Sequence, residues 1–170
     1  MEKAIKVLNA LEKKGLITRY AIGGGIAALF YMEPVFTYDL DVFIRLPEET
    51  GPLMDMGPIY AFLKEKGYAA HKEHVVIEGV PVQMLPAYNA LVEEALEKAV
   101  EKKFKGIKTR VLGPEYLMAI MLQTGRAKDM ARLAQFMEEA EFDRDQYVKI
   151  LTTYGLKEKW EAIVRENQKG

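Results

Sequence analysis

The sequence predicts a mixed α/β fold, in which a small mixed β-sheet is flanked by helices and followed by a C-terminal helical group. Short apolar runs typical of buried strands occur at Tyr20–Ile22, Leu40–Leu46 and Val80–Leu85. Amphipathic helical patterns separate these runs, and from residue 113 onward they take up the rest of the chain. We therefore expect a core over residues 1–112 and a helical subdomain over residues 113–170, packed together as one compact unit.

The first part of the chain alternates helices with strands. Glu2–Lys14 has apolar residues on one stripe and is expected to be a helix that Gly15 ends. The strand that begins at Tyr20 runs into three glycines, which lead into a helix over Gly25–Met32. After the second strand and a loop, Ile59–Lys66 reads as a further helix.

The middle of the chain is richer in strands. Tyr68–Val76 is expected to be one strand that carries His71 and His74. Three residues apart on an extended segment, the two histidines would point to opposite faces, which favours surface histidines over a shared metal site. Glu78–Gly79 then makes a two-residue hairpin turn into the strand Val80–Leu85.

A helix and a basic segment follow. Asn89 is the expected N-cap of a helix that runs to about Val100. Lys102–Leu112 alternates in polarity and is rich in Lys and Arg. One interpretation is an edge strand that its lysines protect from aggregation, and the other is a basic rim for phosphates or an RNA acceptor.

Four helices are expected to close the chain. Pro114 and the acidic residue after it are typical of a helix start, and this helix runs to Gln123. Thr124–Asp129 interrupts the pattern, and Arg126–Ala140 forms the next helix. Two more amphipathic helices are predicted over Phe142–Tyr154 and Leu156–Gln168.

Composition narrows the classes of function. Of the 170 residues, 49% are hydrophobic, and the formal net charge is −1. The sequence shows no basic tail of the kind that indicates general nucleic-acid binding. The chain has no cysteine, which excludes disulfides and thiolate zinc sites. The longest run without charge or proline, Tyr20–Met32, is glycine-rich and too short to span a bilayer. We expect a cytoplasmic protein that does not contact membranes.

Two aspartates carry the most specific chemistry in the sequence. Asp39 and Asp41 are separated by one residue at the start of an apolar strand, so both carboxylates project from the same face. Two neighbouring carboxylates repel each other unless a proton or a cation lies between them. Mg²⁺ is the expected cation, because it takes one or two protein carboxylates and completes its shell with waters and phosphates.

The glycines that precede these aspartates indicate a phosphate site. Gly23, Gly24 and Gly25 stand just before an expected helix start. Without side chains they let the backbone approach a phosphate closely, and the free N–H groups of a first helical turn favour an anion. A metal pair and a phosphate cradle together make up the two halves of a nucleotide site.

The order Gly24-Gly25, a helix-length spacer, and then Thr37-x-Asp39-x-Asp41 resembles the signature of the polymerase-beta-like nucleotidyltransferase superfamily. The likeness is greatest to its small prokaryotic members, the minimal nucleotidyltransferases and the abortive-infection-type nucleotidyltransferase toxins. The resemblance implies a nucleotidyltransferase fold in which the glycines hold the triphosphate and the aspartates bind Mg²⁺. It also implies a third carboxylate on a neighbouring strand.

Other positions of this sequence match the family's pattern only in part. The position that matches the third carboxylate is Gln83, whose neutral amide can hydrogen-bond a ribose or water but cannot take the proton of an attacking hydroxyl. Glu78 is the nearest acid that could replace it. Arg126 and Lys128 match the family's phosphate or acceptor contacts, and Asp129 would orient Lys128 or cap the helix.

A further departure lies in the helix before that segment. Where the family frequently has a lysine, this chain has Met118 or Met121. Three functions remain open. One is Mg²⁺-dependent transfer of a nucleoside monophosphate from an NTP to a hydroxyl of tRNA, a protein or a small molecule. Another is a catalytically degenerate binding protein of the same fold, for example one half of a toxin–antitoxin pair. The third is an interaction protein whose helical C-terminus binds a helical partner and in which the pair of aspartates is incidental.

Overall fold

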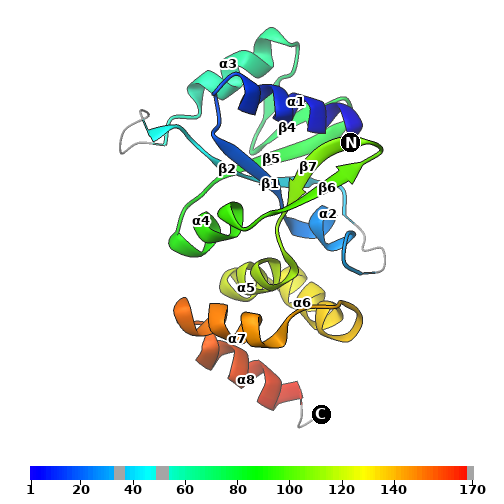
Figure 1. Ribbon diagram of the computed structural model, residues 1–170. Helices are drawn as coiled ribbons and strands as arrows, with labels where there is room; N and C mark the ends of the chain where they lie inside the picture. Colours follow the sequence, from blue (N-terminus) through cyan, green and yellow to red (C-terminus); the bar gives the residue numbers. More distant parts are fainter. Residues whose placement is uncertain (33–36, 49–53, 168–170) are drawn as a thin grey trace.

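The structure is a computed structural model that describes residues 1–32, 37–48 and 54–167. Within these residues, seven strands form one sheet in the order β3-β4-β5-β2-β1-β7-β6 (Figure 1). The strands are β1 (Arg19–Ile22), β2 (Leu40–Arg45), β3 (Ala70–His71), β4 (His74–Ile77), β5 (Val80–Pro86), β6 (Val100–Phe104) and β7 (Ile107–Val111). This mixed sheet confirms the predicted fold class.

Helices cover both faces of the sheet. Figure 1 shows α1 and α3 on one side, and α2, α4 and the stack α5 to α8 on the other. The helices are α1 (Glu2–Lys13), α2 (Gly24–Ala28), α3 (Gly57–Glu65), α4 (Ala90–Glu97), α5 (Pro114–Thr124), α6 (Ala127–Glu139), α7 (Arg144–Thr153) and α8 (Lys157–Asn167). The last predicted residue of the final helix, Gln168, lies outside the described residues.

Strand β2 is central and organises the sheet. It pairs antiparallel with β1 and parallel with β5, and in the second ladder Asp41 lies opposite Gln83. Its residues from Leu40 to Ile44 are all buried, which explains why this strand reads as an almost continuous apolar run. The one acid in the run, Asp41, is therefore placed in the interior of the protein beside its neighbour on β5.

Helix α5 joins the sheet to the C-terminal helices. Every residue from Glu115 to Leu122 is buried, as expected for a helix with packing partners all round. It contacts α2 and α4 on the sheet side and α6 and α7 on the other. The stack ends with α8, whose Trp160 ring lies edge-on to Tyr147 at 5.1 Å between centroids. Helix α5 therefore lies between α2 and α4, which cover the sheet, and the helices α6 and α7.

The prediction of one strand over Tyr68–Val76 is wrong. The chain instead turns back after two residues, so that β3 and β4 form a hairpin in which His71 lies opposite His74. The expectation that these histidines point to opposite faces is also wrong, because directly paired residues share a face. The turn at Lys72 adopts a φ of +56°, which a lysine rarely takes and which the sequence therefore did not indicate.

The single strand predicted over Lys102–Leu112 is likewise two strands. Lys105 and Gly106, with φ of +47° and +81°, turn the chain between β6 and β7. A two-residue hairpin turn commonly requires positive φ at both positions. Of these two strands, only β6 lies at an edge of the sheet. Its lysines agree with the interpretation of an edge strand that is protected from aggregation.

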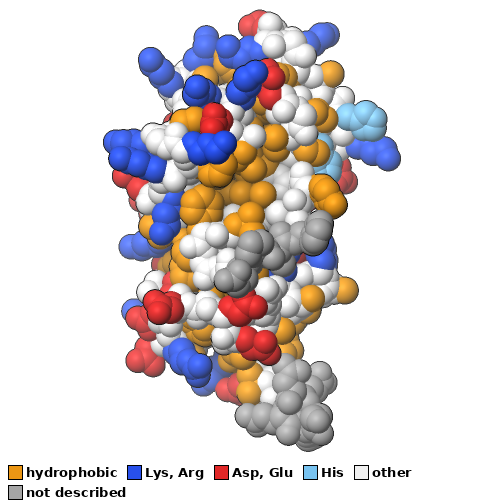
Figure 2. Space-filling model, turned by 90° about the vertical axis from the view of Figure 1, so that its right-hand side faces the viewer, with side chains coloured by type: hydrophobic (Ala, Val, Ile, Leu, Met, Phe, Trp, Pro, Cys, Tyr) orange, Lys and Arg blue, Asp and Glu red, His pale blue; other side chains and the backbone are white. Residues whose placement is uncertain are grey.

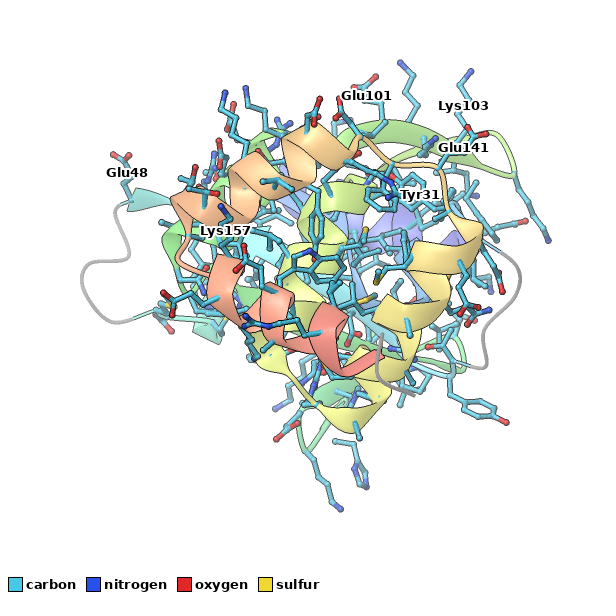
Figure 3. The ribbon with its side chains drawn as sticks, turned by 90° about the horizontal axis from the view of Figure 1, so that it is seen from below. Tyr31, Glu48, Glu101, Lys103, Glu141 and Lys157 are labelled. Atoms are coloured by element: carbon cyan, nitrogen blue, oxygen red, sulfur yellow. The ribbon has the colours of Figure 1, made fainter. Side chains whose placement is uncertain are left out.

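The lysines of β6 point in two directions. Lys103 and Glu101 point away from the protein (Figure 3), whereas the Lys102 ammonium lies 5.5 Å from the centroid of the Tyr31 ring. Figure 2 shows Lys and Arg side chains gathered over the upper half of one face of the protein, above a broad apolar area. Lys102 and Lys103 do not line the cavity beside Asp41.

Two helices end at least three residues before their predicted ends. Helix α2 ends at Ala28 and not at Met32, because the chain continues in single turns in which Tyr31 N–H donates to the Ala28 carbonyl. Helix α4 ends at Glu97, three residues before the expected end at Val100. Its start is confirmed, since Asn89 Oδ1 accepts a hydrogen bond from the Val92 N–H at 2.9 Å.

Within the described ranges, no helix combines the length and apolar character needed to cross a membrane.

Candidate functional site

Asp39 and Asp41 form an acidic pair at the start of β2. Asp41 is only 8% exposed, and Asp39 is half-buried beside it. Burial raises the pKa of Asp41, and the negative charge of Asp39 raises it further. The positive charges of Lys128, Arg126 and Arg132 act in the opposite direction. The structure thus brings together acids and cations that are almost ninety residues apart in the sequence, and Arg132 is a cation that sequence reasoning missed.

The first turn of α2 rests directly on Asp41. A Cβ atom on Gly24 would lie 1.9 Å from Asp41 Oδ2, and Gly24 has a φ of +57°. A Cβ on Gly25 would lie 2.8 Å from both Thr37 Oγ1 and Arg132 Nη2. The two glycines are therefore required for the close approach of side chains from β2, the preceding loop and α6.

Asp39 has a neighbour on each side of its carboxylate. The Thr37 hydroxyl donates to Asp39 Oδ1 at 3.3 Å, and His74 Nε2 lies 4.0 Å from Asp39 Oδ2. Sequence reasoning missed His74, because its position depends on the β3–β4 hairpin. A turn signal at Lys72–Glu73 would have been needed to find it, and neither residue type is typical of turns.

Gln83 lies next to Asp41 across the β2–β5 ladder, at the place where the family resemblance implies a third carboxylate. Its Nε2 group donates to Glu73 Oε2 at 3.4 Å, so the acid that this amide binds comes from the β3–β4 turn. Glu78, the acid considered as a replacement base, is instead paired with Lys3 of α1 at 2.8 Å. That pairing, in a separate surface group, removes Glu78 from the set of residues around Asp41.

The junction between α5 and α6 supplies a second polar group. The Asp129 carboxylate is 5% exposed, and its Oδ2 atom accepts from Arg126 Nε at 2.6 Å and from Thr124 Oγ1 at 2.8 Å. The hydrogen bonds of the Asp129 carboxylate thus go to Arg126 and Thr124 and not to Lys128, which it was expected to orient. The expectation that Asp129 caps the helix is wrong, because the start of α6 has no side-chain cap.

A cavity of about 340 Å³ is lined both by Asp41 and by residues of this junction. Its walls are mostly apolar, and its charged or amide side chains are those of Asp41 and Gln83 on the sheet and of Arg126 and Asp129 at the junction. The lining residues come from α2, β2, β5, the loop before α4, α5 and the start of α6: Gly24, Asp41, Phe43, Gln83, Leu85, Tyr88, Leu117, Ile120, Met121, Thr124, Arg126 and Asp129. Its volume falls within the usual range for small-molecule sites.

The donor atoms around Asp41 fit a magnesium ion with an incomplete protein shell. Among the described residues, no group of three or more His, Asp or Glu side chains is placed to share one metal ion. Asp39 and Asp41 still offer two carboxylates. Burial raises the pKa of Asp41, and the charge of Asp39 raises it further, so a cation between the two groups would relieve their repulsion. Two carboxylates with waters and phosphate oxygens are a common arrangement for Mg²⁺.

Comparison with known proteins places the fold. No protein-family model matches the sequence, and no curated protein sequence matches it. The structure is similar to an antigenic nucleotidyltransferase-like protein from Paracoccidioides brasiliensis, with a TM-score of 0.60 and 13% identity over 98% of this chain and 88% of that chain. It is also similar to the antibiotic-resistance factor ANT(2'')-Ia, with a TM-score of 0.53 and 15% identity over 99% and 98%. At such identities the likeness shows the nucleotidyltransferase fold.

Proposed function

We propose that this chain is a Mg²⁺-dependent nucleotidyltransferase that moves a nucleoside monophosphate from an NTP to an acceptor hydroxyl. The observation that carries the proposal is the buried Asp41 beside Asp39, with the glycine backbone of α2 against it and cations of α6 facing it. Acids that hold a metal and cations that neutralise phosphate are the two needs of this reaction, which depends mainly on positioning and charge stabilisation.

Each group has a defined role in the proposal. Asp39 and Asp41 would hold Mg²⁺, which when bound would neutralise phosphate charge. Gly24 and Gly25 would bring the backbone close to the triphosphate, and Thr37 keeps Asp39 oriented through its hydroxyl. The acceptor oxygen would attack the α-phosphorus, the bond to pyrophosphate would break, and the acceptor proton would pass to solvent because the Gln83 amide cannot accept it.

The cations would act from the other segment of the chain. Lys128 and Arg126 belong to the start of α6. The positive charge of each opposes the rise in the pKa of Asp41 that burial and Asp39 cause. We propose the division into a core over residues 1–112, which carries the acids, and a helical subdomain over residues 113–170, which carries these cations. A site shared in this way would be complete only when the two segments are packed together.

One observation favours a second function. Gln83 stands where the resemblance implies a third carboxylate, and the acid that its amide binds, Glu73, is exposed at a hairpin turn. A degenerate nucleotidyltransferase that binds NTP without turnover, as one half of a toxin–antitoxin pair, would need no base at this position. The likeness to the minimal and abortive-infection-type nucleotidyltransferases is compatible with both proposed functions. A tRNA, a protein or a small molecule would be the acceptor in the transfer reaction alone.

The test is a thermal-shift panel with each of four NTPs, with and without Mg²⁺. A ligand present at about 100 times its Kd stabilises the native state by about 2.7 kcal/mol, which is readily seen in the melting temperature. We expect a Mg²⁺-dependent shift for at least one NTP and its loss in the double variant Asp39→Asn/Asp41→Asn. Asp145→Asn, which changes an exposed aspartate of α7, is the matched control and should retain the shift.

The same panel separates the alternatives. An equal shift in wild type and in the double variant would contradict the proposed metal site. A shift without label transfer from an α-labelled NTP to tRNA, cellular protein or a metabolite extract would favour the degenerate binding protein.

A further inference from the structure

Strand β6 leaves one edge of the sheet open. Within the described residues, no strand pairs with its outer side, whereas its inner side pairs with β7. The strand at the opposite edge, β3, has only two residues, so β6 with five residues is the longer open edge. An open edge presents backbone N–H and C=O groups that can pair with another chain.

The backbone of β7 shows which residues of β6 face outward. The N–H of Leu112, the residue after β7, donates to a carbonyl of β1. The N–H of Val111 therefore points the other way, toward β6, where its partner is Val100. Because these directions alternate along a strand, the backbone groups of Glu101 and Lys103 point away from β7. These two residues offer the open hydrogen-bonding groups of the edge.

The two outward residues carry opposite charges that lack partners. The side chains of Glu101 and Lys103 are exposed and point away from the protein (Figure 3). In the part of the chain that the structure describes, neither forms an ion pair. The residue opposite Lys103 on β7 is Lys108, and Arg110, opposite Glu101, is bound to Glu12 at 2.8 Å. Both charges would therefore gain from an opposite charge on another chain.

One register of a second copy pairs both charges at once. If two copies of β6 lie antiparallel with Lys102 on the two-fold axis, Glu101 of each copy lies opposite Lys103 of the other. These are the residues whose backbone groups point outward, so each pair would also exchange its backbone hydrogen bonds. On the other face, Val100 would lie opposite Phe104, which is an apolar pair. A two-fold interface requires this kind of self-complementarity.

Other registers bring like charges together. If the axis passed through Glu101 or through Lys103, that residue would face its own copy. The charges of β6 therefore oppose general pairing and permit one register, which agrees with a protected edge. The like pair that remains is Lys102 on the axis. Its ammonium lies 5.5 Å from the centroid of the Tyr31 ring of its own chain, which offsets part of the repulsion.

We propose that β6 is the contact between two copies of this chain, which join as an antiparallel homodimer with one continuous sheet. A contact built mainly from one edge strand is smaller than a stable interface of about 1,200 to 2,000 Å². The dimer should therefore be weak and form as the protein concentration rises. This inference does not rest on the proposed function, because no residue of β6 belongs to the proposed nucleotide site.

The test measures the mass of the 19.3 kDa chain by sedimentation equilibrium at low salt, where charges are little screened. The mass of the wild type should rise from one chain toward two as its concentration approaches about 1 mM. Glu101→Lys and Lys103→Glu each place like charges opposite each other in both symmetric pairs. Each variant alone should weaken the dimer about tenfold.

Two further samples restore the charge pairs. An equimolar mixture of Glu101→Lys and Lys103→Glu should recover the dimer, because every pair then joins a lysine to a glutamate. The double variant Glu101→Lys/Lys103→Glu should behave like the wild type for the same reason. Glu65→Lys on α3 and Lys149→Glu on α7 are the matched controls, since they reverse exposed charges away from the edge and should leave the dimer unchanged.

Hydrogen exchange measured by NMR locates the contact in the wild type. The amide N–H groups of Glu101 and Lys103 should exchange more slowly as the concentration rises. The N–H of Lys102, which faces β7, should change less. This measurement needs no variant, so it stays decisive if a charge reversal disturbs folding.

Four outcomes would overturn the inference. A mass of one chain at about 1 mM would exclude a dimer with a Kd of that size, which would place half of the chains in dimers. A dimer that both single reversals leave intact would have its contact elsewhere. Failure of the mixture to recover the dimer would show that the two charges do not meet. Unchanged exchange at Glu101 and Lys103 while the mass rises would show that the edge stays open.

Discussion

Two groups of residues around Asp41 are built in different ways. The group proposed for the triphosphate is polar and comes largely from Gly24, Thr37 and Asp41. The cavity next to it is mostly apolar. Gly24 and Asp41 also line this cavity, and the rest of its walls come from two strands of the sheet, the loop before α4, α5 and the start of α6. The comparison teaches that one carboxylate can have two environments, one specified by neighbours in sequence and the other by packing between distant elements.

This difference has a consequence for how each side tolerates change. On the polar side, glycines allow side chains to approach the backbone within distances that no Cβ would permit. On the cavity side, apolar side chains face empty space, so moderate changes of shape can be absorbed. Substitutions on the polar side should therefore have the larger effects on stability.

The largest expected effect comes from Gly24→Ala. The added Cβ would lie 1.9 Å from Asp41 Oδ2 at a backbone φ of +57°. We expect a loss of about 3 kcal/mol in the free energy of unfolding, measured by urea denaturation, together with loss of the NTP response.

Gly15→Ala is the matched control for this variant. Gly15 has a φ of +72°, but an added Cβ would meet no atom within 4 Å. It should lower the free energy of unfolding by only about 1 kcal/mol, the contribution of the backbone conformation alone. Equal losses in the two variants would show that Asp41 does not depend on the space at Gly24.

A smaller effect is expected from Gln83→Asp, which places a third carboxylate beside Asp41. Without Mg²⁺ the added charge should destabilise the fold by about 1 kcal/mol through like-charge repulsion. With Mg²⁺ the loss should be reversed, because a cation can bind among three carboxylates. Melting temperatures with and without Mg²⁺ measure both effects.

The control for the added charge is Gln83→Asn, which shortens the side chain in the same way and stays neutral. It should show no response to Mg²⁺ beyond that of the wild type. If the aspartate and asparagine variants respond alike to Mg²⁺, the position on β5 does not communicate with the acidic pair.

The smallest effect is expected from Tyr31→Phe, at the point where the segment after α2 meets the C-terminal helices. The Tyr31 hydroxyl donates to the Leu112 carbonyl at 3.0 Å, and its ring lies 6.2 Å from that of Phe136. Removal of the hydroxyl should lower the free energy of unfolding by about 0.5 kcal/mol at neutral pH, the lower end of what one hydrogen bond contributes. Urea denaturation at several pH values provides the measurement.

The pH dependence of this variant has a defined sign. Burial, with the charge of Glu115, raises the pKa of Tyr31 to about 12 from an ordinary value of 10.0. The folded state therefore holds the phenol proton more tightly than the unfolded state, and the stability that this gives is present below pH 10 and lost as the pH rises through 12. Tyr31→Phe should flatten part of this alkaline loss, whereas Tyr60→Phe on α3 should not. An unchanged alkaline slope in Tyr31→Phe would contradict the burial of the phenol.

Some elements could be predicted because their signals are local. The residues from Leu40 to Ile44 are apolar on both faces and mark a buried central strand, and Asn89 marks a helix start by its own hydrogen bond. The pair Asp39 and Asp41 lies within three residues, so strand alternation alone brings the two carboxylates together. Gln83 was matched to the third acidic position by the apolar residues around it, and the ladder places it opposite Asp41.

Other elements depended on turns that their residue types do not indicate. Lys72 adopts positive φ although lysine rarely does, and so the β3–β4 hairpin and the approach of His74 to Asp39 were missed. Gly106 was a usable turn signal for the β6–β7 hairpin, but the regular alternation around it concealed the turn. The choice of Arg126 over Lys128 as the partner of Asp129 depends on side-chain direction at the start of α6.

The sequence alone determined the mixed α/β class, the central strand and the acidic pair, because strand alternation, glycine backbone freedom and helix starts act over a few neighbouring residues. Only the tertiary structure decided that the charges of Arg126 and Arg132 act on Asp41 and that an apolar cavity opens beside it. These features join residues separated by up to about ninety positions, and their relative placement follows from the burial of apolar surface by the whole sheet and α5.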